Sequence, residues 1–176
     1  IAEYREHPHP QHLLKTLCKN VDQVLGEAWK NLDLPSGSVL IAVGGYGRGE
    51  LFPYSDVDVL ILLEKSPDQV LQAKLESLIQ LFWTLGLTIG HSVRTIGECL
   101  EESANDITVQ TSLLEARYIT GNRKLFQLMR ERYNARMNPS AFFIAKMLET
   151  RQRHVKFGDT PYSLEPNCKE SPGGLR

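Results

Sequence analysis

The stretch of sequence that decides the fold is VGGYGRGELFPYSDVDVLIL, residues 43–62. The apolar run at residues 39–43 leads into it and predicts a buried strand that ends at Gly44 and Gly45. After a glycine-rich loop and a turn, acidic and apolar residues open a second predicted strand at residues 56–63. The predicted order is therefore strand, glycine-rich loop, turn and strand.

The second strand carries a pair of carboxylates. Asp56 and Asp58 are two residues apart, and side chains alternate between the faces of a strand, so both carboxylates are expected on one face while Val57 and Val59 point into the core. Two neighbouring carboxylates repel each other, and a divalent cation relieves that repulsion. Magnesium is normally held by one or two carboxylates together with substrate phosphates. We therefore expect Asp56 and Asp58 to bind Mg²⁺ or Mn²⁺ and to be catalytic.

The glycine-rich loop is suited to phosphate binding. Gly44 and Gly45 carry no side chains, so their backbone N–H groups can approach a triphosphate closely, and a following helical turn adds positive potential. Arg48 is placed to donate charge-assisted hydrogen bonds to phosphates. Ser55, beside the first carboxylate, can donate to a phosphate oxygen.

Each signal has a simpler interpretation when it stands alone. Two aspartates on a strand usually mark a solvated edge, and glycines between strands usually mark a tight turn. Their combination, with ten residues between Gly45 and Asp56, favours a metal and nucleotide site. A Walker loop is excluded because no Gly-Lys-Ser/Thr follows, and the Rossmann fingerprint fails because Glu50 stands where its third glycine should be.

The rest of the chain predicts an α+β fold, with a small mixed sheet and flanking helices, followed by a helical region. Apolar periodicity predicts helices at residues 10–34 and 67–85, and the third strand is expected at residues 87–94. Residues 95–157 show only helical patterns, and residues 158–176 read as an extended loop.

The expected division is a core with its N-terminal helix at residues 1–95 and a helical region with a C-terminal loop at residues 96–176. Because the chain starts at Ile1 and stops at Arg176, directly after a Gly-Gly pair and a leucine, we expect it to be part of a longer protein.

Composition limits the function classes. The 176 residues include 20 Lys and Arg, 21 Asp and Glu, and 41% apolar residues, which excludes collagen-like and wholly disordered chains. No apolar run is long enough to suggest a membrane span, and three widely separated cysteines indicate neither disulfides nor zinc, so we expect a soluble, cytoplasmic protein.

Charge is divided unevenly along the chain. Residues 1–116 carry 8 basic and 16 acidic side chains, and residues 117–176 carry 12 basic and 5 acidic ones. An acidic site beside a basic surface suits a metal-bound nucleotide, although two solvated helical faces would give the same pattern.

The motifs resemble those of a known family. Gly44-Gly45 followed by Asp56-Val57-Asp58-Val59 resembles the signature of the DNA polymerase β-like nucleotidyltransferase superfamily. More closely, residues 43–62, GHSVRT at 90–95 and LEPNCKESPGGLR at 164–176 are similar to the transferase region of the bifunctional uridylyltransferase/uridylyl-removing enzymes that modify the nitrogen-regulatory PII signal protein.

The resemblance implies transfer of UMP from UTP to a tyrosine hydroxyl of PII, with release of pyrophosphate. We expect an in-line displacement with two metal ions, one held by Asp56 and Asp58 and one that neutralises the β- and γ-phosphates. Removal of UMP belongs, in this family, to a separate HD domain. None of the five histidines here is followed by Asp, so we expect no removal activity by that route.

Two parts of the predicted site stay open at this point. The superfamily usually adds a third carboxylate from a neighbouring strand, but residues 87–94 contain no Asp or Glu; the candidates are Glu98, Asp106, Glu115 or an acidic residue beyond Arg176. Similarity to the adenylyltransferases of glutamine synthetase places Lys169 near the phosphates, with Gly173, Gly174 and Arg176; the alternative is a loop ordered by packing.

Two other functions compete with PII uridylylation. One is a sensor module that binds a metal–nucleotide complex without turnover, which the missing third carboxylate keeps open. The other is an adenylyltransferase acting on another protein. A nucleic-acid partner is disfavoured because the sequence has no basic stripe interleaved with aromatic residues, and no membrane partner is expected.

Overall fold

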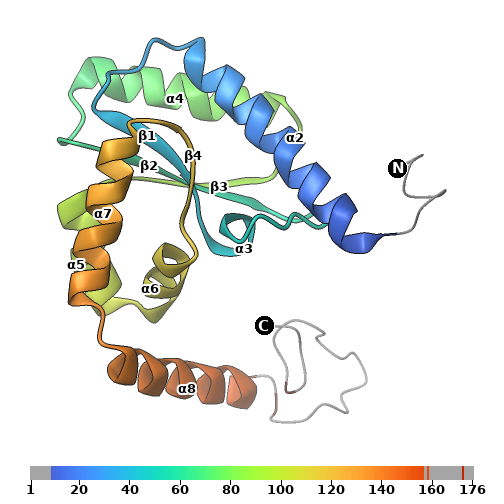
Figure 1. Ribbon diagram of the computed structural model, residues 1–176, viewed down its shortest axis with the longest axis vertical. Coiled ribbons are helices and arrows are strands. Elements are labelled where there is room, and N and C mark those ends of the chain that lie inside the picture. The colour runs from blue at the N-terminus through green and yellow to red at the C-terminus, as the bar shows by residue number, and fades with distance from the viewer. Residues whose placement is uncertain (1–8, 157, 159–171, 173–176) are drawn as a thin grey trace. The chain divides into compact units, whose positions relative to one another are not determined.

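The computed structural model describes residues 9–156, 158 and 172 of the chain. Its strands form one four-stranded mixed sheet, in the order β3-β2-β1-β4 (Figure 1). β1 pairs antiparallel with both β2 and β4, and β2 pairs parallel with β3. The strands are β1 (Ser38–Ala42), β2 (Val57–Leu63), β3 (Ile89–Thr95) and β4 (Arg117–Gly121). The α+β class with a small mixed sheet, expected from the sequence, is confirmed.

Helices connect and cover the strands. They are α2 (Pro10–Lys30), α3 (Gly44–Gly47), α4 (Gln69–Thr84), α5 (Ile96–Asn105), α6 (Ile107–Leu114) and α7 (Arg123–Arg136); a further helix, α8 (Pro139–Lys156), follows along the chain. α2 begins at a proline, whose missing N–H and fixed φ suit the first helical position. α4 begins where the Asp68 side chain accepts a hydrogen bond from Leu71 N at 2.8 Å.

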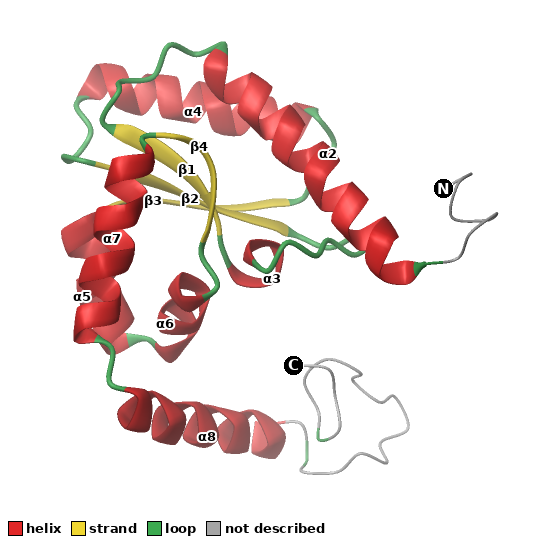
Figure 2. Ribbon diagram, viewed as in Figure 1, coloured by secondary structure: helices red, strands yellow, loops and turns green. Residues whose placement is uncertain are grey.

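Both faces of the sheet are buried, which explains why the two central strands read as continuous apolar runs. α2 and α4 cover one face, where Val57 and Val59 pack with Trp29 and Phe82 (Figure 2). The alternate residues, such as Leu60 and Leu62, face the layer of α5, α6 and α7. The predicted burial of Val57 and Val59 is confirmed.

The strand β4 was not expected. The sequence predicts only helices over residues 95–157, and this is wrong for Arg117–Gly121, which pairs with β1. The pairing shifts register between Leu40 and Ile41, and the residues of β4 are at most half-buried. A five-residue edge strand of this kind depends on its partner more than on its own pattern.

The chain forms two compact units, residues 1–135 and 136–176. The first unit continues past residue 95, where the sequence placed the boundary, because β4 returns to pair with β1. The second unit contains α8, and most of the predicted C-terminal loop lies outside the described residues. None of the helices in the described part of the chain has the length and apolar character needed to cross a bilayer.

Candidate functional site

Asp58 lies in the second position of β2, between two glycines. It is paired with Gly90 of β3, and its backbone oxygen accepts a hydrogen bond from Val43 N at 3.0 Å. A Cβ on Gly90 would stand 2.3 Å from Asp58 Oδ1, and a Cβ on Gly44 would stand 3.3 Å from Oδ2. The half-buried carboxylate therefore occupies space that side chains at both neighbours would fill.

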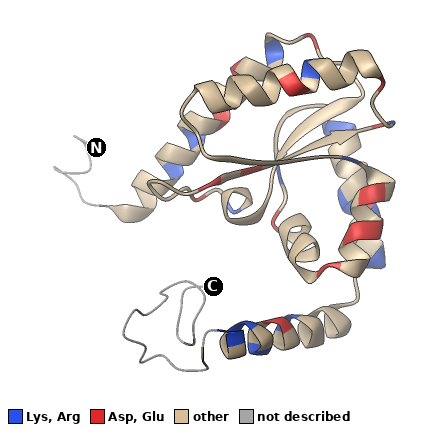
Figure 3. Cartoon of the chain, turned by 180° about the vertical axis from the view of Figure 1, so that it is seen from behind, with Lys and Arg blue, Asp and Glu red and all other residues tan. Residues whose placement is uncertain are grey.

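Asp56 lies one residue before β2 begins and is exposed, so the strand starts one residue later than the sequence predicts. The pairing starts at Val57, whose N–H donates to Thr88 O at 2.8 Å. Acidic residues thus mark the beginning of β2 (Figure 3). The two predicted carboxylates therefore lie at the same end of β2, with Asp58 inside the sheet and Asp56 exposed just before the strand begins.

The predicted phosphate loop folds into the single helical turn α3 (Gly44–Gly47), directly after β1. We call this turn the glycine turn. Gly44 has φ +57°, a left-handed conformation that favours glycine. Gly47 N donates to Val43 O at 3.0 Å, which closes the turn. Because Gly44 also adjoins Asp58 Oδ2, the structure brings the predicted phosphate-binding glycine and the predicted metal-binding carboxylate together.

A buried tyrosine anchors this turn to the rest of the domain. The Tyr46 hydroxyl donates to Asp22 Oδ1 at 2.5 Å, and Tyr46 is 1% exposed. Arg117 Nη1 donates to Asp22 Oδ2 at 2.7 Å, Arg117 Nη2 donates to Tyr46 O at 3.3 Å, and the guanidinium carbon lies 5.2 Å from the Tyr46 ring centroid. Burial, and then the hydrogen bond to Asp22, raise the pKa of Tyr46 well above its usual range. Sequence reasoning missed Asp22 and Arg117, because no local pattern joins α2 to β4.

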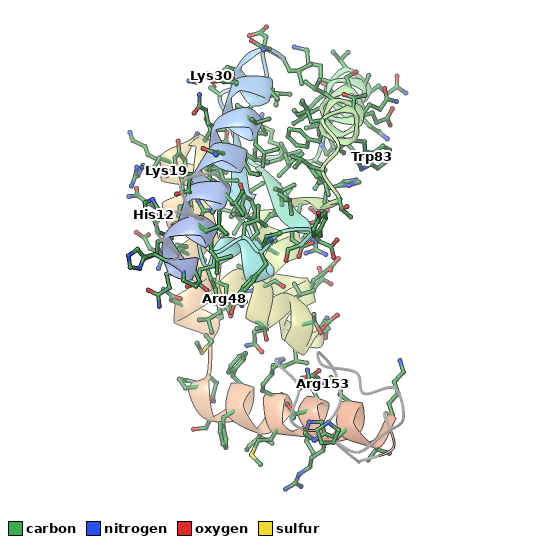
Figure 4. The ribbon with its side chains drawn as sticks, turned by 90° about the vertical axis from the view of Figure 1, so that its right-hand side faces the viewer. His12, Lys19, Lys30, Arg48, Trp83 and Arg153 are labelled. Atoms are coloured by element: carbon green, nitrogen blue, oxygen red, sulfur yellow. The ribbon has the colours of Figure 1, made fainter. Side chains whose placement is uncertain are left out.

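Arg48, the predicted phosphate ligand, directly follows the turn (Figure 4). Its Nη2 is 3.5 Å from the point where a Cβ on Gly45 would stand. Its Nη1 donates to Glu115 Oε1 at 2.8 Å. One of the three described candidates for the third carboxylate, Glu115, is therefore paired with the predicted phosphate ligand.

The family model described as "Nucleotidyltransferase domain" matches residues 19–111, which include the glycine turn and both aspartates. The chain belongs to this nucleotidyltransferase family. A second model, described as "GlnD PII-uridylyltransferase", matches residues 141–176.

Several curated relatives of the nucleotidyltransferase chain carry the name "Bifunctional uridylyltransferase/uridylyl-removing enzyme". The chain is 58% identical over its 176 residues to the proteins of Cupriavidus pinatubonensis and Cupriavidus metallidurans. It is 51% identical over the same length to that of Ralstonia nicotianae. In each case the chain spans 20% of the relative's own length. The resemblance inferred from the sequence motifs is thus confirmed.

Solved structures give a weaker likeness. A mutant of the MntA–HpeT toxin–antitoxin is 11% identical with a TM-score of 0.44, covering 78% of this chain and 96% of that one. The complex of tri-AMPylated HEPN toxin and MNT antitoxin from Shewanella oneidensis is 12% identical with a TM-score of 0.40, covering 78% and 97%. We draw no functional conclusion from likeness at this level.

The other two candidates for a third carboxylate cap helices of the nucleotidyltransferase domain. Glu98 accepts from Thr95 N at 2.6 Å, and hydrogen bonds from the backbone and then the side chain of Thr95 lower the pKa of Glu98. Asp106 accepts from Thr108 N at 2.6 Å at the start of α6. Within the described residues, no group of three or more His, Cys, Asp and Glu side chains is arranged to hold a metal ion. The neighbouring strand offers a glycine, Gly90, beside Asp58.

The remaining predicted residues are placed differently. Ser55 is exposed in the turn before Asp56, where its N–H donates to Phe52 O at 3.1 Å. Lys169 lies outside the described residues, as do Gly173, Gly174 and Arg176. The described part of the predicted site therefore consists of the glycine turn, Arg48, Ser55 and the two aspartates.

Proposed function

We propose that this chain transfers UMP from UTP to a tyrosine hydroxyl of the PII signal protein and releases pyrophosphate, as one part of a bifunctional uridylyltransferase/uridylyl-removing enzyme. The observation that carries the proposal is the Asp58 carboxylate seated between Gly44 and Gly90, beside the glycine turn. The relatives' names and the PII-uridylyltransferase match support the choice of UMP and PII.

The donors at this position suit a hard divalent cation. Asp56 and Asp58 supply carboxylate oxygens, the ligands that Mg²⁺ and Mn²⁺ prefer, and Asp58 lies in a cradle that a Cβ at either neighbouring glycine would fill. Asp56 and Asp58 would hold one of two metal ions. When bound, the ions would activate the acceptor oxygen and neutralise the charge of the phosphates.

The chain's own residues bind and orient the nucleotide. In this proposal the backbone N–H groups of Gly44 and Gly45 donate to phosphate oxygens, as does Arg48 at the end of the turn, and Ser55 donates beside Asp56. In the reaction, a bond forms between the tyrosine oxygen and the α-phosphorus while the bond from the α-phosphorus to the oxygen bridging to the β-phosphate breaks, so pyrophosphate leaves and the hydroxyl proton passes to solvent. The nucleophile belongs to PII, so this domain acts by positioning and by electrostatics.

Conservative replacement of the carboxylates tests the proposal. We expect Asp56→Asn and Asp58→Asn each to lower the rate of UMP transfer from labelled UTP to PII at least about 100-fold, because a ligand that acts in the transition state is lost. Asp33→Asn is the matched control, since Asp33 is exposed and has φ +44°, which asparagine also adopts. Near-normal transfer by either site variant, with the fold intact by circular dichroism, would contradict the assignment.

A sensor that binds metal–nucleotide without turnover is the second candidate. The glycine beside Asp58 favours it, because the neighbouring strand supplies no carboxylate at that register. Calorimetric titration with Mg–UTP, followed by addition of PII and a pyrophosphate assay, separates binding from turnover. The same titration with Mg–ATP tests the adenylyltransferase alternative: tighter binding of ATP than of UTP would favour it.

A further inference from the structure

The chain between α6 and β4 lies against the glycine turn at Glu115, and the first residue of β4, Arg117, contacts the turn as well. Glu115 Oε1 accepts a hydrogen bond from Arg48 Nη1 at 2.8 Å. A Cβ on Gly47 would stand 2.2 Å from the backbone oxygen of Glu115, so the two backbones are in direct contact. Arg117 Nη2 donates to Tyr46 O at 3.3 Å. The position of Glu115 relative to the turn is therefore fixed by contacts beyond its own side chain.

The Arg48 guanidinium has two ends with different surroundings. Nη1 is held by Glu115, and Nη2 faces Gly45, 3.5 Å from the point where a Cβ would stand. A guanidinium is a rigid planar fork, so holding one nitrogen orients the other. The Glu115 side chain is 24% exposed and that of Arg48 is 54% exposed, so the carboxylate is the more enclosed partner and Arg48 the accessible one.

We propose that Glu115 is a positioning residue that holds Arg48 with its second nitrogen aimed at the glycine turn, ready for the phosphates of UTP. This inference rests on the proposed function, because it assigns the triphosphate as the ligand of Arg48. It gives Glu115 a role other than the third metal ligand for which the sequence made it a candidate.

A purely electrostatic role for Glu115 predicts that its removal strengthens triphosphate binding, whereas a positioning role predicts that its removal weakens it. A carboxylate beside Arg48 cancels part of its charge, so removing that carboxylate would strengthen triphosphate binding if charge alone mattered. Positioning predicts weaker binding, because Arg48 then loses the contact that orients it. The pair is too exposed to contribute much to folding, so neither role predicts a large change in melting temperature.

Two substitutions of Glu115 separate these roles. We expect Glu115→Ala to weaken Mg–UTP binding to the 176-residue chain about tenfold by calorimetry, the scale of one hydrogen bond to a charged group. Glu115→Gln should lose less than about threefold, because its amide oxygen still accepts from Arg48 Nη1. Glu101→Ala, at an exposed glutamate of α5, controls for the change in net charge.

A double-mutant cycle with Arg48→Ala tests whether Glu115 acts through Arg48. We expect Glu115→Ala to have no further effect on Mg–UTP binding once Arg48 is alanine. A general structural role would weaken binding equally in both backgrounds and would overturn the inference, as would wild-type or tighter binding in Glu115→Ala alone. Failure of the wild-type chain to bind Mg–UTP would overturn the proposed function itself, and this inference with it.

Discussion

Gly90 of β3 is paired directly with Asp58 of β2, and a Cβ on Gly90 would stand 2.3 Å from Asp58 Oδ1. Real Cβ atoms do not approach an oxygen so closely, and the obstacle is the carboxylate itself. A side chain at position 90 therefore fits only if the Asp58 carboxylate moves. At Gly90, strand β3 thus leaves space for Asp58, a proposed metal ligand.

We therefore expect Gly90→Ala to displace the Asp58 carboxylate and to lower the proposed UMP transfer to PII at least about tenfold, because small displacements of a group in the site carry large rate penalties. Gly97→Ala is the matched control, since a Cβ there would meet its nearest atom, Thr95 Oγ1, only at 3.9 Å. Steady-state rates with labelled UTP measure both variants. Equal rates for the two would show that Asp58 can move without loss of function.

The close contact between the glycine turn and the backbone of Glu115 can be tested through the free energy of unfolding. A Cβ on Gly47 would stand 2.2 Å from Glu115 O and 3.2 Å from Ala42 O, both of them backbone atoms that cannot swing away. Gly47→Ala should lower the free energy of unfolding by about 1–3 kcal/mol, the usual penalty for overpacking. Urea denaturation measures it.

Gly45→Ala is the control for this contact. Its Cβ would meet only the flexible Arg48 side chain, at 3.5 Å, an ordinary van der Waals distance. Its free energy of unfolding should stay close to that of the wild type. If Gly47→Ala proved as stable as Gly45→Ala, the close approach of the two backbones would be refuted.

The parts of the site that could be predicted from the sequence are local. Asp56 and Asp58 are two residues apart at the start of an apolar run, and the alternation of a strand places Val57 and Val59 in the core whatever the rest of the chain does. The prediction of a phosphate-binding turn at Gly44 and Gly45 likewise needs only the residues next to them in the sequence. These features need no knowledge of distant contacts.

The missed parts depend on contacts between distant segments. Asp22 and Arg117 are 95 positions apart, so nothing near either residue shows that they meet under Tyr46. β4 is short and lies at an edge of the sheet, where pairing with β1 decides its conformation. The role of Glu115 became visible only when the structure brought it to Arg48, 67 positions away.

The Asp22–Arg117 pair should contribute to stability because both side chains are mostly buried, at 25% and 29% exposed, and share two hydrogen bonds. We expect Arg117→Ala to lower the free energy of unfolding by about 2 kcal/mol, since it leaves the Asp22 carboxylate with one partner fewer in a partly buried position. Chemical denaturation measures the change.

A second ion pair of the same length serves as control for this prediction. Arg94 Nη2 lies 2.7 Å from Glu102 Oε2, but Glu102 is 51% exposed, so Arg94→Ala should cost less than about 1 kcal/mol. Equal losses from the two alanine variants would mean that burial of Asp22 and Arg117 adds nothing to their interaction.

Cys99 on α5 makes the stability of the domain depend on pH. The side chain is 0% exposed, and burial raises the pKa of its thiol from 9.0 to about 12. Between these values the unfolded chain releases the thiol proton while the folded protein keeps it. The stabilisation is therefore fully present below about pH 9 and is lost as the pH rises toward 12.

We expect the free energy of unfolding of the wild type to fall, relative to that of Cys99→Ala, by about 1.4 kcal/mol per pH unit above pH 9. Urea denaturation of both proteins at half-unit steps from pH 8 to about pH 10.5 measures the difference. Lysines and tyrosines also titrate in this range, but they are common to both proteins, so their contribution cancels. The alanine variant starts from a lower stability because it leaves a cavity, and only the slope of the difference reports the thiol. Parallel curves would show that Cys99 ionises as readily in the folded protein as in the unfolded chain.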